Sequence, residues 1–158
     1  MLKLDLGGGR FPRVGYLNVD RFERADVRCE FEDNLPFKDS SAEAIFASHL
    51  LEHISDLKGL MNECWRILIN EGSLEILVPR FPHTDSVVDP THCRFFVEDT
   101  FKYFQIDHPL RKVYGFKPWN IESLGYSDNE VYCILRALKI KEWSEEEVEM
   151  IKKIREKK

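Results

Sequence analysis

The chain has 158 residues, of which 43% are hydrophobic and 32% charged, and its net charge is −5 at pH 7. This length and composition predict one globular domain over residues 1–158. No apolar run approaches the twenty or so residues of a membrane span, so we expect no membrane-spanning helix. The negative charge argues against a general affinity for nucleic acid.

Cysteine usage and the start of the chain bear on the cellular compartment. The four cysteines are widely spaced and form no C-x-x-C pair, which is typical of free thiols in a reducing environment. The N-terminus enters an apolar run without the pattern of a signal peptide. We therefore expect a cytoplasmic protein.

Short apolar runs alternate with polar or helical stretches through the first half of the chain. We expect five strands there, the third of them at a sheet edge and the fifth ended by Pro79. They are Leu2–Leu6, Tyr16–Val19, Asp26–Cys29, Ala44–Ala47 and Leu74–Val78. This alternation predicts an α/β fold with one doubly wound, mostly parallel sheet of the Rossmann-like type.

A helix is predicted to begin at Ser55-Asp56, between the fourth and fifth strands. Its apolar residues recur at i, i+3, i+4 and i+7, which gives one packed face. This face comprises Leu57, Leu60, Met61, Cys64, Trp65 and Leu68. We expect Asn70-Glu71-Gly72 to end the helix as a glycine cap.

The last third of the chain predicts a further helix and a late strand pair. The helix is expected over Val97–Phe104, with Phe101 and Phe104 packed inward. Val131–Leu138 is expected to be a late strand, with the weaker Arg111–Phe116 stretch as its antiparallel partner.

The C-terminal segment carries the signature of a helix start. Ser144 and Glu147 form a capping box, and Trp143 and Val148 flank it as a hydrophobic staple. We expect this helix to pack on the sheet, in place of a helix that the chain lacks before its first strand.

The first twenty residues place glycines and an aspartate at the ends of neighbouring strands. Gly7–Gly9 follow the first strand, and Asp20 follows the second. Glycine lets a ligand approach the main chain, and a carboxylate at a strand end can accept both ribose hydroxyls. We therefore predict a nucleoside site at the carboxyl ends of the strands. The alternatives are a plain tight turn and an ion pair between Asp20 and Arg21 or Arg24.

The spacing of these residues selects the type of nucleoside. Dinucleotide folds use G-x-G-x-x-G, then a helix, and an acid about twenty residues on. Here Pro12 occupies the third glycine position, and Asp20 follows Gly7 too closely for a full helix. No Walker phosphate loop is present either. The pattern favours a ligand with a ribose and no pyrophosphate, S-adenosylmethionine rather than NAD or ATP.

Five segments in this order resemble the class I S-adenosylmethionine-dependent methyltransferases, in particular their short, methyltransferase type 11-like branch. They cover roughly residues 2–105 and depart from the family in the truncated helix after the glycines and the missing helix before the first strand. The segments are Leu4–Gly9, Asn18–Asp20, Leu35–Phe37, Ala47–Ile54, and Glu63–Leu68 leading to Gly72.

The resemblance implies S-adenosylmethionine as the methyl donor and a set of residues that bind it. These residues are Asp5, Gly7, Gly8, Gly9, Asp20, Glu30, Ser48 and His49. Asp5 would hold the glycine loop and the methionine ammonium, the alternative being a purely structural hydrogen bond. Glu30 would accept the adenine amino group, with Asp33 as the alternative. Ser48 and His49 would lie beside the methionine part of the donor.

Three nearby residues could take part in the ligand site or have a purely structural role. Leu35 and Phe37 would supply an apolar wall for the adenine or pack in the core. His53 is expected to be a structural histidine that hydrogen-bonds its own neighbourhood.

The segment Arg80–Phe96 leaves the carboxyl end of the fifth strand, so it should arch over the same face as the ligand. In one interpretation it forms an acceptor pocket where His92 or Asp89 accepts a proton as the methyl group is transferred. In a second, His83, Asp85, Asp89 and His92 bind a metal, although they match no specific template and we assign no metal site. In a third, Asp–Arg pairs and histidine hydrogen bonds simply hold the loop together.

Together these features predict an S-adenosylmethionine-dependent methyltransferase with an unidentified, small-molecule acceptor. The alternative is a non-catalytic S-adenosylmethionine-binding or regulatory subunit with the same fold. The oligomeric state stays open, and a homodimer is compatible with the pattern.

Overall fold

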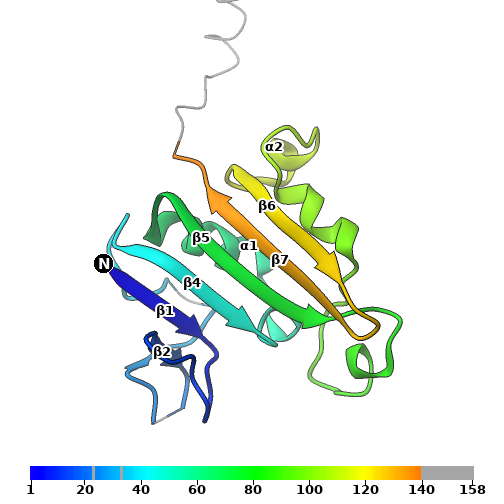
Figure 1. Cartoon of the computed structure of the whole chain (residues 1–158), viewed down its shortest axis with the longest axis horizontal. Coiled ribbons are helices and arrows are strands. Elements are labelled where there is room, and N and C mark those ends of the chain that lie inside the picture. Colours follow the sequence, from blue (N-terminus) through cyan, green and yellow to red (C-terminus); the bar gives the residue numbers. More distant parts are fainter. Residues whose placement is uncertain (23, 33, 140–158) are drawn as a thin grey trace, which may run out of the picture.

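The computed structural model describes residues 1–22, 24–32 and 34–139. Within this part, seven strands form one sheet in the order β3-β2-β1-β4-β5-β7-β6 (Figure 1). They are β1 (Leu2–Leu6), β2 (Leu17–Asp20), β3 (Val27–Arg28), β4 (Ala42–Ser48), β5 (Leu68–Pro79), β6 (Trp119–Tyr126) and β7 (Glu130–Ala137). The predicted C-terminal helix around Ser144 and Glu147 lies outside the described residues.

The sheet is mostly parallel. β1 pairs in parallel with β2 and β4, and β4 pairs in parallel with β5, whereas β7 runs antiparallel to both β5 and β6. The apolar residues of β1, β4, β5 and β7 alternate into a common core, as Leu4, Leu6, Ile45, Ile76 and Leu135 show. The predicted fold class, a Rossmann-like methyltransferase fold with a late antiparallel strand, is confirmed.

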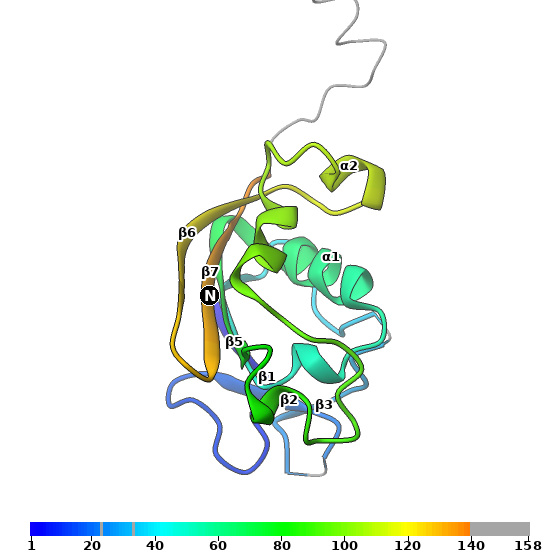
Figure 2. The same ribbon diagram turned by 90° about the vertical axis from the view of Figure 1, so that its right-hand side faces the viewer.

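The described helices lie on one side of the sheet (Figure 2). They are α1 (Leu57–Ile67) and α2 (Arg111–Tyr114), and the 3-10 segments are η1 (Leu51–His53), η2 (Thr84–Ser86) and η3 (Glu98–Phe104). Phe101 and Phe104 of η3 are buried, as predicted. The loop from β1 to β2 contains no helix, which agrees with the short spacing. In this part of the chain no helix is long and apolar enough to cross a membrane.

The start of α1 agrees with the sequence, but its end does not. Asp56 caps the helix by accepting a hydrogen bond of 2.9 Å from the amide of Gly59. The helix ends at Ile67, because Leu68 is already extended and begins β5, so the predicted glycine cap is wrong. Gly72 lies instead in a bulge of β5, where Ala42 pairs with Leu68 but Ala44 pairs with Ser73.

The predicted partner of the late strand is also wrong. Arg111–Tyr114 is the short helix α2, and the strand that pairs with β7 is β6, Trp119–Tyr126. The tight connection Ser127–Asn129 makes this pairing a hairpin. A bulge between Ile121 and Ser123 interrupts the alternation of buried and exposed residues along β6. That interruption hides the strand from a search for period-2 patterns.

Candidate donor and acceptor site

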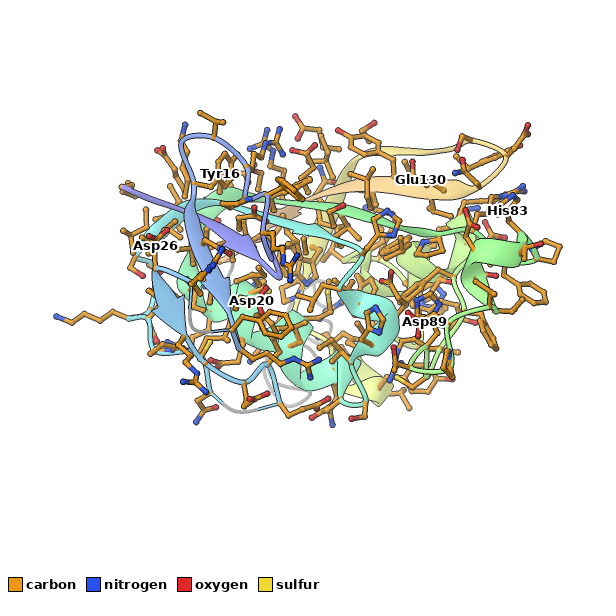
Figure 3. All side chains as sticks on the ribbon, turned by 90° about the horizontal axis from the view of Figure 1, so that it is seen from below. Tyr16, Asp20, Asp26, His83, Asp89 and Glu130 are labelled. Atoms are coloured by element: carbon orange, nitrogen blue, oxygen red, sulfur yellow. The ribbon has the colours of Figure 1, made fainter. Side chains whose placement is uncertain are left out.

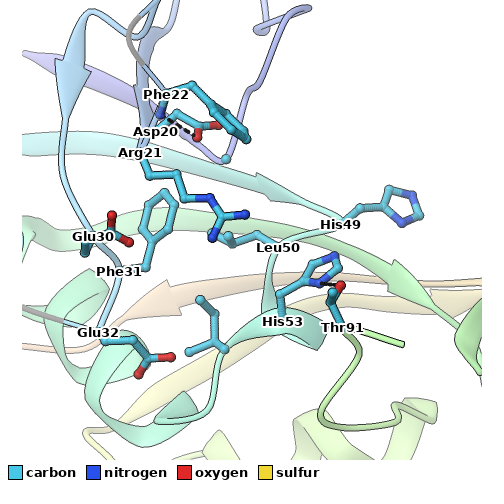
Figure 4. Close-up of a pocket in the computed structure, with 12 residues that line it drawn as sticks. Asp20, Arg21, Phe22, Glu30, Phe31, Glu32, His49, Leu50, His53 and Thr91 are labelled. Carbon is cyan, nitrogen blue, oxygen red and sulfur yellow. Dashed lines mark hydrogen bonds between the residues drawn. The ribbon is translucent and has the colours of Figure 1, made fainter. Parts of the chain in front are cut away.

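A cavity of about 360 Å3 lies at the carboxyl ends of the parallel strands. Gly7, Asp20, Glu30 and His49, all expected to bind the donor, line it. The other lining residues, which sequence reasoning placed elsewhere or missed, are Arg21, Phe22, Phe31, Glu32, Leu50, His53, Ile54 and Thr91. Figure 4 shows Asp20 and His53 on different sides of this space.

The glycine loop presents bare backbone between the ends of β1 and β2. Gly7 adopts a positive φ of 74°, and its amide donates to the carbonyl of Val19 at 2.8 Å. A Cβ on Gly8 would lie 2.7 Å from Oδ1 of Asn18 and Oδ2 of Asp5. Gly8 and Gly9, also expected to bind the donor, do not line the cavity themselves.

Asp20 is buried at the tip of β2, with an exposed fraction of 5%. Its Oδ2 accepts from the amide of Gly9 at 3.0 Å, and its Oδ1 accepts from the amide of Phe22 at 3.3 Å. Among the described residues it forms no ion pair with Arg21 or Arg24. The guanidinium of Arg21 instead projects into the cavity (Figure 4) and lies 5.3 Å from the ring centre of Phe22.

Asp5 lies behind the glycine loop and does not line the cavity. Its Oδ2 accepts a hydrogen bond of 2.6 Å from the amide of Arg13. Burial raises the pKa of this carboxyl, and the bond to Arg13 partly opposes that effect. The structural hydrogen bond, one of the two roles considered for Asp5, is therefore present.

The wall on the β3 side combines an acid with apolar side chains. Glu30 and Phe31 follow β3 and face the cavity (Figure 4). Leu35 packs in the core and Phe37 packs against it, and neither lines the cavity. The expected apolar wall is therefore supplied by other residues. Asp33, the alternative to Glu30, lies outside the described residues.

The residue that follows β4 lies at the cavity. Ser48 is the last residue of β4 and does not line the cavity, whereas His49 does, with a positive φ of 52°. Nδ1 of His49 lies 3.4 Å from Oε1 of Glu52, and Nε2 lies 3.0 Å from Oε1 of Glu130. These two carboxylates, Glu52 foremost, raise the pKa of His49.

The loop Arg80–Phe96 lies over this end of the sheet, as expected. Figure 3 looks at the carboxyl ends of the parallel strands and shows Asp89 and His83 across the molecule from Asp20. The expected Asp–Arg pairs do not form among the described residues, because Arg80 contacts Glu98. Arg94 instead donates to the carbonyls of Ile54 at 2.8 Å and Ser55 at 2.6 Å. The loop is thereby joined to the segment after η1.

Histidine hydrogen bonds do form in this loop. Oδ1 of Asp89 accepts from the hydroxyl of Thr91 at 2.7 Å, and that hydroxyl oxygen lies 2.9 Å from Nδ1 of His53. Hydrogen bonds from Thr91 lower the pKa of Asp89. Nδ1 of His92 lies 3.0 Å from the carbonyl oxygen of Ser86. His53 is thus engaged structurally, as predicted, but it also lines the cavity.

The four residues considered as a metal site are not brought together as one. His83 contacts Asp85 at 3.4 Å. His92 instead joins Glu52 and His53, and one ligand atom from each of these three lies within 4.8 Å of the others. Sequence reasoning missed Glu52, although a glutamate within the apolar run Leu50–Ile54 was a usable signal.

Comparisons with known proteins find sequence similarity to a methyltransferase domain and to an archaeal protein. Residues 14–76 match a family model described as a methyltransferase domain. An uncharacterized protein of Methanocaldococcus jannaschii, MJ0638, is 34% identical over 109 residues, which are 68% of this chain and 41% of that protein. The chain therefore spans less than half the length of this curated relative.

Solved structures show the same fold. An S-adenosylmethionine-dependent methyltransferase from Archaeoglobus fulgidus superposes with a TM-score of 0.61 at 17% identity, over 85% of each chain. A complex between the Haloferax volcanii Trm112 methyltransferase activator and a methyltransferase gives 0.61 at 12% identity, over 87% of this chain and 82% of that one. These neighbours identify the fold as that of the class I S-adenosylmethionine-dependent methyltransferases.

Proposed function

We propose that this chain, which has the class I methyltransferase fold and matches a methyltransferase domain, binds S-adenosylmethionine and transfers its methyl group to a small molecule. The observation that carries the proposal is the pairing of a bare glycine loop with the buried Asp20 beside one cavity. The cavity volume of about 360 Å3 falls in the range of roughly 300–1,000 Å3 of small-molecule sites.

The lining residues fit the parts of such a donor. The carboxylate of Asp20 would accept the two ribose hydroxyls, because among the described residues it forms no ion pair with an arginine. Glu30 would accept the adenine amino group, and Phe31 and Leu50 would pack against the adenine ring. A side chain at Gly7 would crowd Leu50, because its Cβ would lie 3.2 Å from that residue, so glycine keeps this wall of the cavity in place.

The residues at and behind the His53 side of the cavity would serve the acceptor: His53 and Thr91 line it, whereas His92 and Asp89 lie behind them and do not. The bound donor supplies a methyl group on a positively charged sulfur, so alignment of the acceptor provides much of the rate. His92 has a ring nitrogen that can take up the acceptor's proton or hold an ion that lowers the acceptor's pKa. Asp89 would act through Thr91, which it holds against His53.

Ligand-dependent stabilisation tests the donor assignment. S-adenosylmethionine or S-adenosylhomocysteine at a hundred times its dissociation constant should stabilise the protein by about 2.7 kcal/mol. NAD and ATP should have much smaller effects, because the loop after β1 lacks the helix that binds a pyrophosphate. If neither sulfur compound raises the melting temperature at millimolar concentration, the donor assignment is wrong.

A second candidate function is that of a donor-binding subunit whose activity requires another chain. One observation favours it: a structural neighbour was solved as a complex with an activator protein. A screen of the purified chain with labelled donor and candidate acceptors distinguishes the two. Donor binding without turnover would support the subunit.

A further inference from the structure

We propose that Glu52, His53 and His92 form a binding site for one divalent transition-metal ion at the edge of the cavity. One ligand atom from each residue lies within 4.8 Å of the other two. The ring centres of the two histidines are 4.7 Å apart. Two imidazoles and one carboxylate thus converge from two segments that are far apart in the sequence.

Backbone hydrogen bonds hold the two segments together. The amide of Cys93, which follows His92, donates to the carbonyl of Glu52 at 2.9 Å. The guanidinium of Arg94 donates to the carbonyls of Ile54 and Ser55. Glu52, His53 and His92 are therefore kept close by bonds that do not involve their own side chains.

The carboxylate of Glu52 is a second observation at this place, because it lacks hydrogen bonds although His49 lies nearby. Glu52 has an exposed fraction of 1%, and neither of its carboxylate oxygens has a hydrogen-bond partner among the described residues. Nδ1 of His49 lies 3.4 Å from its Oε1, and Oε2 has no ionic partner within 4.0 Å among the described residues. Burying a carboxylate without hydrogen bonds is unfavourable, and a bound metal ion would supply a partner.

The outer hydrogen bonds of the two histidines engage Nδ1 in each ring. The carbonyl oxygen of Ser86 can only accept, so Nδ1 of His92 carries a proton, and Nε2 is the nitrogen with the lone pair in the neutral ring. The hydroxyl of Thr91 donates to Asp89, so it accepts from Nδ1 of His53 and leaves Nε2 of that ring free as well. An outer hydrogen bond from the second ring nitrogen to an oxygen is the common support of a metal ligand.

The ligand types select the class of ion. Two imidazoles and a carboxylate suit Zn2+, Fe2+ or Co2+, whereas Mg2+ and Ca2+ prefer oxygen ligands throughout. Ligands about 2.0–2.1 Å from a tetrahedral zinc ion lie roughly 3.4 Å apart, so small rotations of the exposed His53 and the half-buried His92 would close the site. Three protein ligands leave a coordination position for water or substrate.

The metal site would also serve the proposed methyl transfer. Its existence does not depend on that function; only the role of the ion in the transfer rests on the proposed function. His53 lines the cavity, so an ion at this site would face the acceptor side. An acceptor hydroxyl or amine bound to the ion would lose its proton to water more readily. Its lone pair would then form the bond to the methyl carbon, while the electrons of the breaking carbon–sulfur bond stay on sulfur.

Titration of metal-free protein with Zn2+, in the absence of donor, tests the site directly. We expect one bound ion by calorimetry, and with Co2+ a visible absorption spectrum from nitrogen coordination. His53→Ala, His92→Ala and Glu52→Gln should each weaken binding by at least about a hundredfold. Thr91→Val should weaken it by about ten- to a hundredfold, since it removes only the outer support of His53.

Two variants of the same loop serve as matched controls. His83→Ala removes a histidine that contacts Asp85 and lies outside the cluster, and Cys93→Ser removes a neighbouring exposed thiol that could bind zinc by itself. Both should retain wild-type affinity, and circular dichroism should show that every variant is folded. Equal affinity of folded ligand variants and wild type, or loss of binding in either control, would overturn the proposal. Because donor is absent, this outcome does not depend on whether S-adenosylmethionine binds.

Discussion

The amide of Gly9 donates a hydrogen bond of 3.0 Å to Oδ2 of Asp20, which joins the loop after β1 to the last residue of β2. The same carboxylate also accepts from the amide of Phe22. Asp20 is therefore held rigidly by main-chain donors, and it lines the cavity. A preoriented carboxylate of this kind loses little freedom when a ligand binds.

Replacement of Asp20 by alanine should strongly reduce donor binding. Each charge-assisted hydrogen bond to a ribose hydroxyl contributes about 1.5–3 kcal/mol, or roughly ten- to a hundredfold in affinity. Calorimetry with S-adenosylhomocysteine measures the loss. Glu43→Gln, on β4 away from the cavity, is the matched control and should bind normally. Unchanged affinity of Asp20→Ala would refute the role of Asp20.

Gly8→Ala should damage both the fold and donor binding, although Gly8 does not line the cavity. The new Cβ would lie 2.7 Å from oxygens of Asn18 and Asp5, so the loop or both polar side chains must shift, at a cost of about 1–3 kcal/mol. Gly125→Ala is the control, because nothing lies within 4 Å of the position that a Cβ would take there. Urea unfolding of both variants makes the comparison, and equal stabilities would show that the loop tolerates a side chain.

Glu63→Gln should destabilise the protein in a pH-dependent manner. Glu63 accepts from Nε and Nη2 of Arg66 and from the amide of Leu35, and these bonds, Arg66 foremost, lower its pKa. The stabilisation is therefore complete above the unfolded-state pKa of about 4.5 and is lost as pH falls through the lower folded-state pKa. At pH 7 the loss should be about 1.5–3 kcal/mol. A difference from wild type that stays constant down to pH 2 would contradict this linkage.

Thiol reactivity should divide the cysteines by burial. Burial raises the pKa of Cys64 and of Cys133 to about 12, so neither forms appreciable thiolate at pH 8. Cys93 is exposed and should react with a thiol reagent in the native protein. Mass spectrometry locates the modified residue, and the reagent should modify all four cysteines after unfolding in guanidinium. Rapid native modification of Cys64 would argue against the packing of α1.

His92→Ala should spare donor binding and impair turnover once an acceptor is known. A lost general base costs about a hundred- to ten-thousandfold in rate and removes the acidic limb of the pH profile. If His92 binds a metal instead, a chelator should reproduce the loss in the wild type. Normal turnover of the variant across the pH range, together with wild-type activity that a chelator does not reduce, would show that His92 is structural.

Local patterns in the sequence were sufficient for most of the sheet and for the donor side of the site. Short apolar runs predicted β1, β2, β4 and β7 to within about two residues at each end, because the burial of a strand leaves an apolar run in its own sequence. The pairing of Gly7 with Asp20 could likewise be predicted, since the ends of adjacent parallel strands meet at one edge of the sheet.

Long-range contacts decided the rest. β6 was missed because its bulge breaks the alternation, and α1 ends early because Leu68 is required as the first paired residue of β5. The cluster of Glu52, His53 and His92 depends on the hydrogen bond between Cys93 and Glu52, which are 41 residues apart. The sequence by itself determined where glycine makes the backbone flexible, which side chains are charged, and how the apolar residues are spaced. Only the tertiary structure decided which distant side chains meet, because such contacts arise from packing of whole elements and leave no periodic trace in the chain.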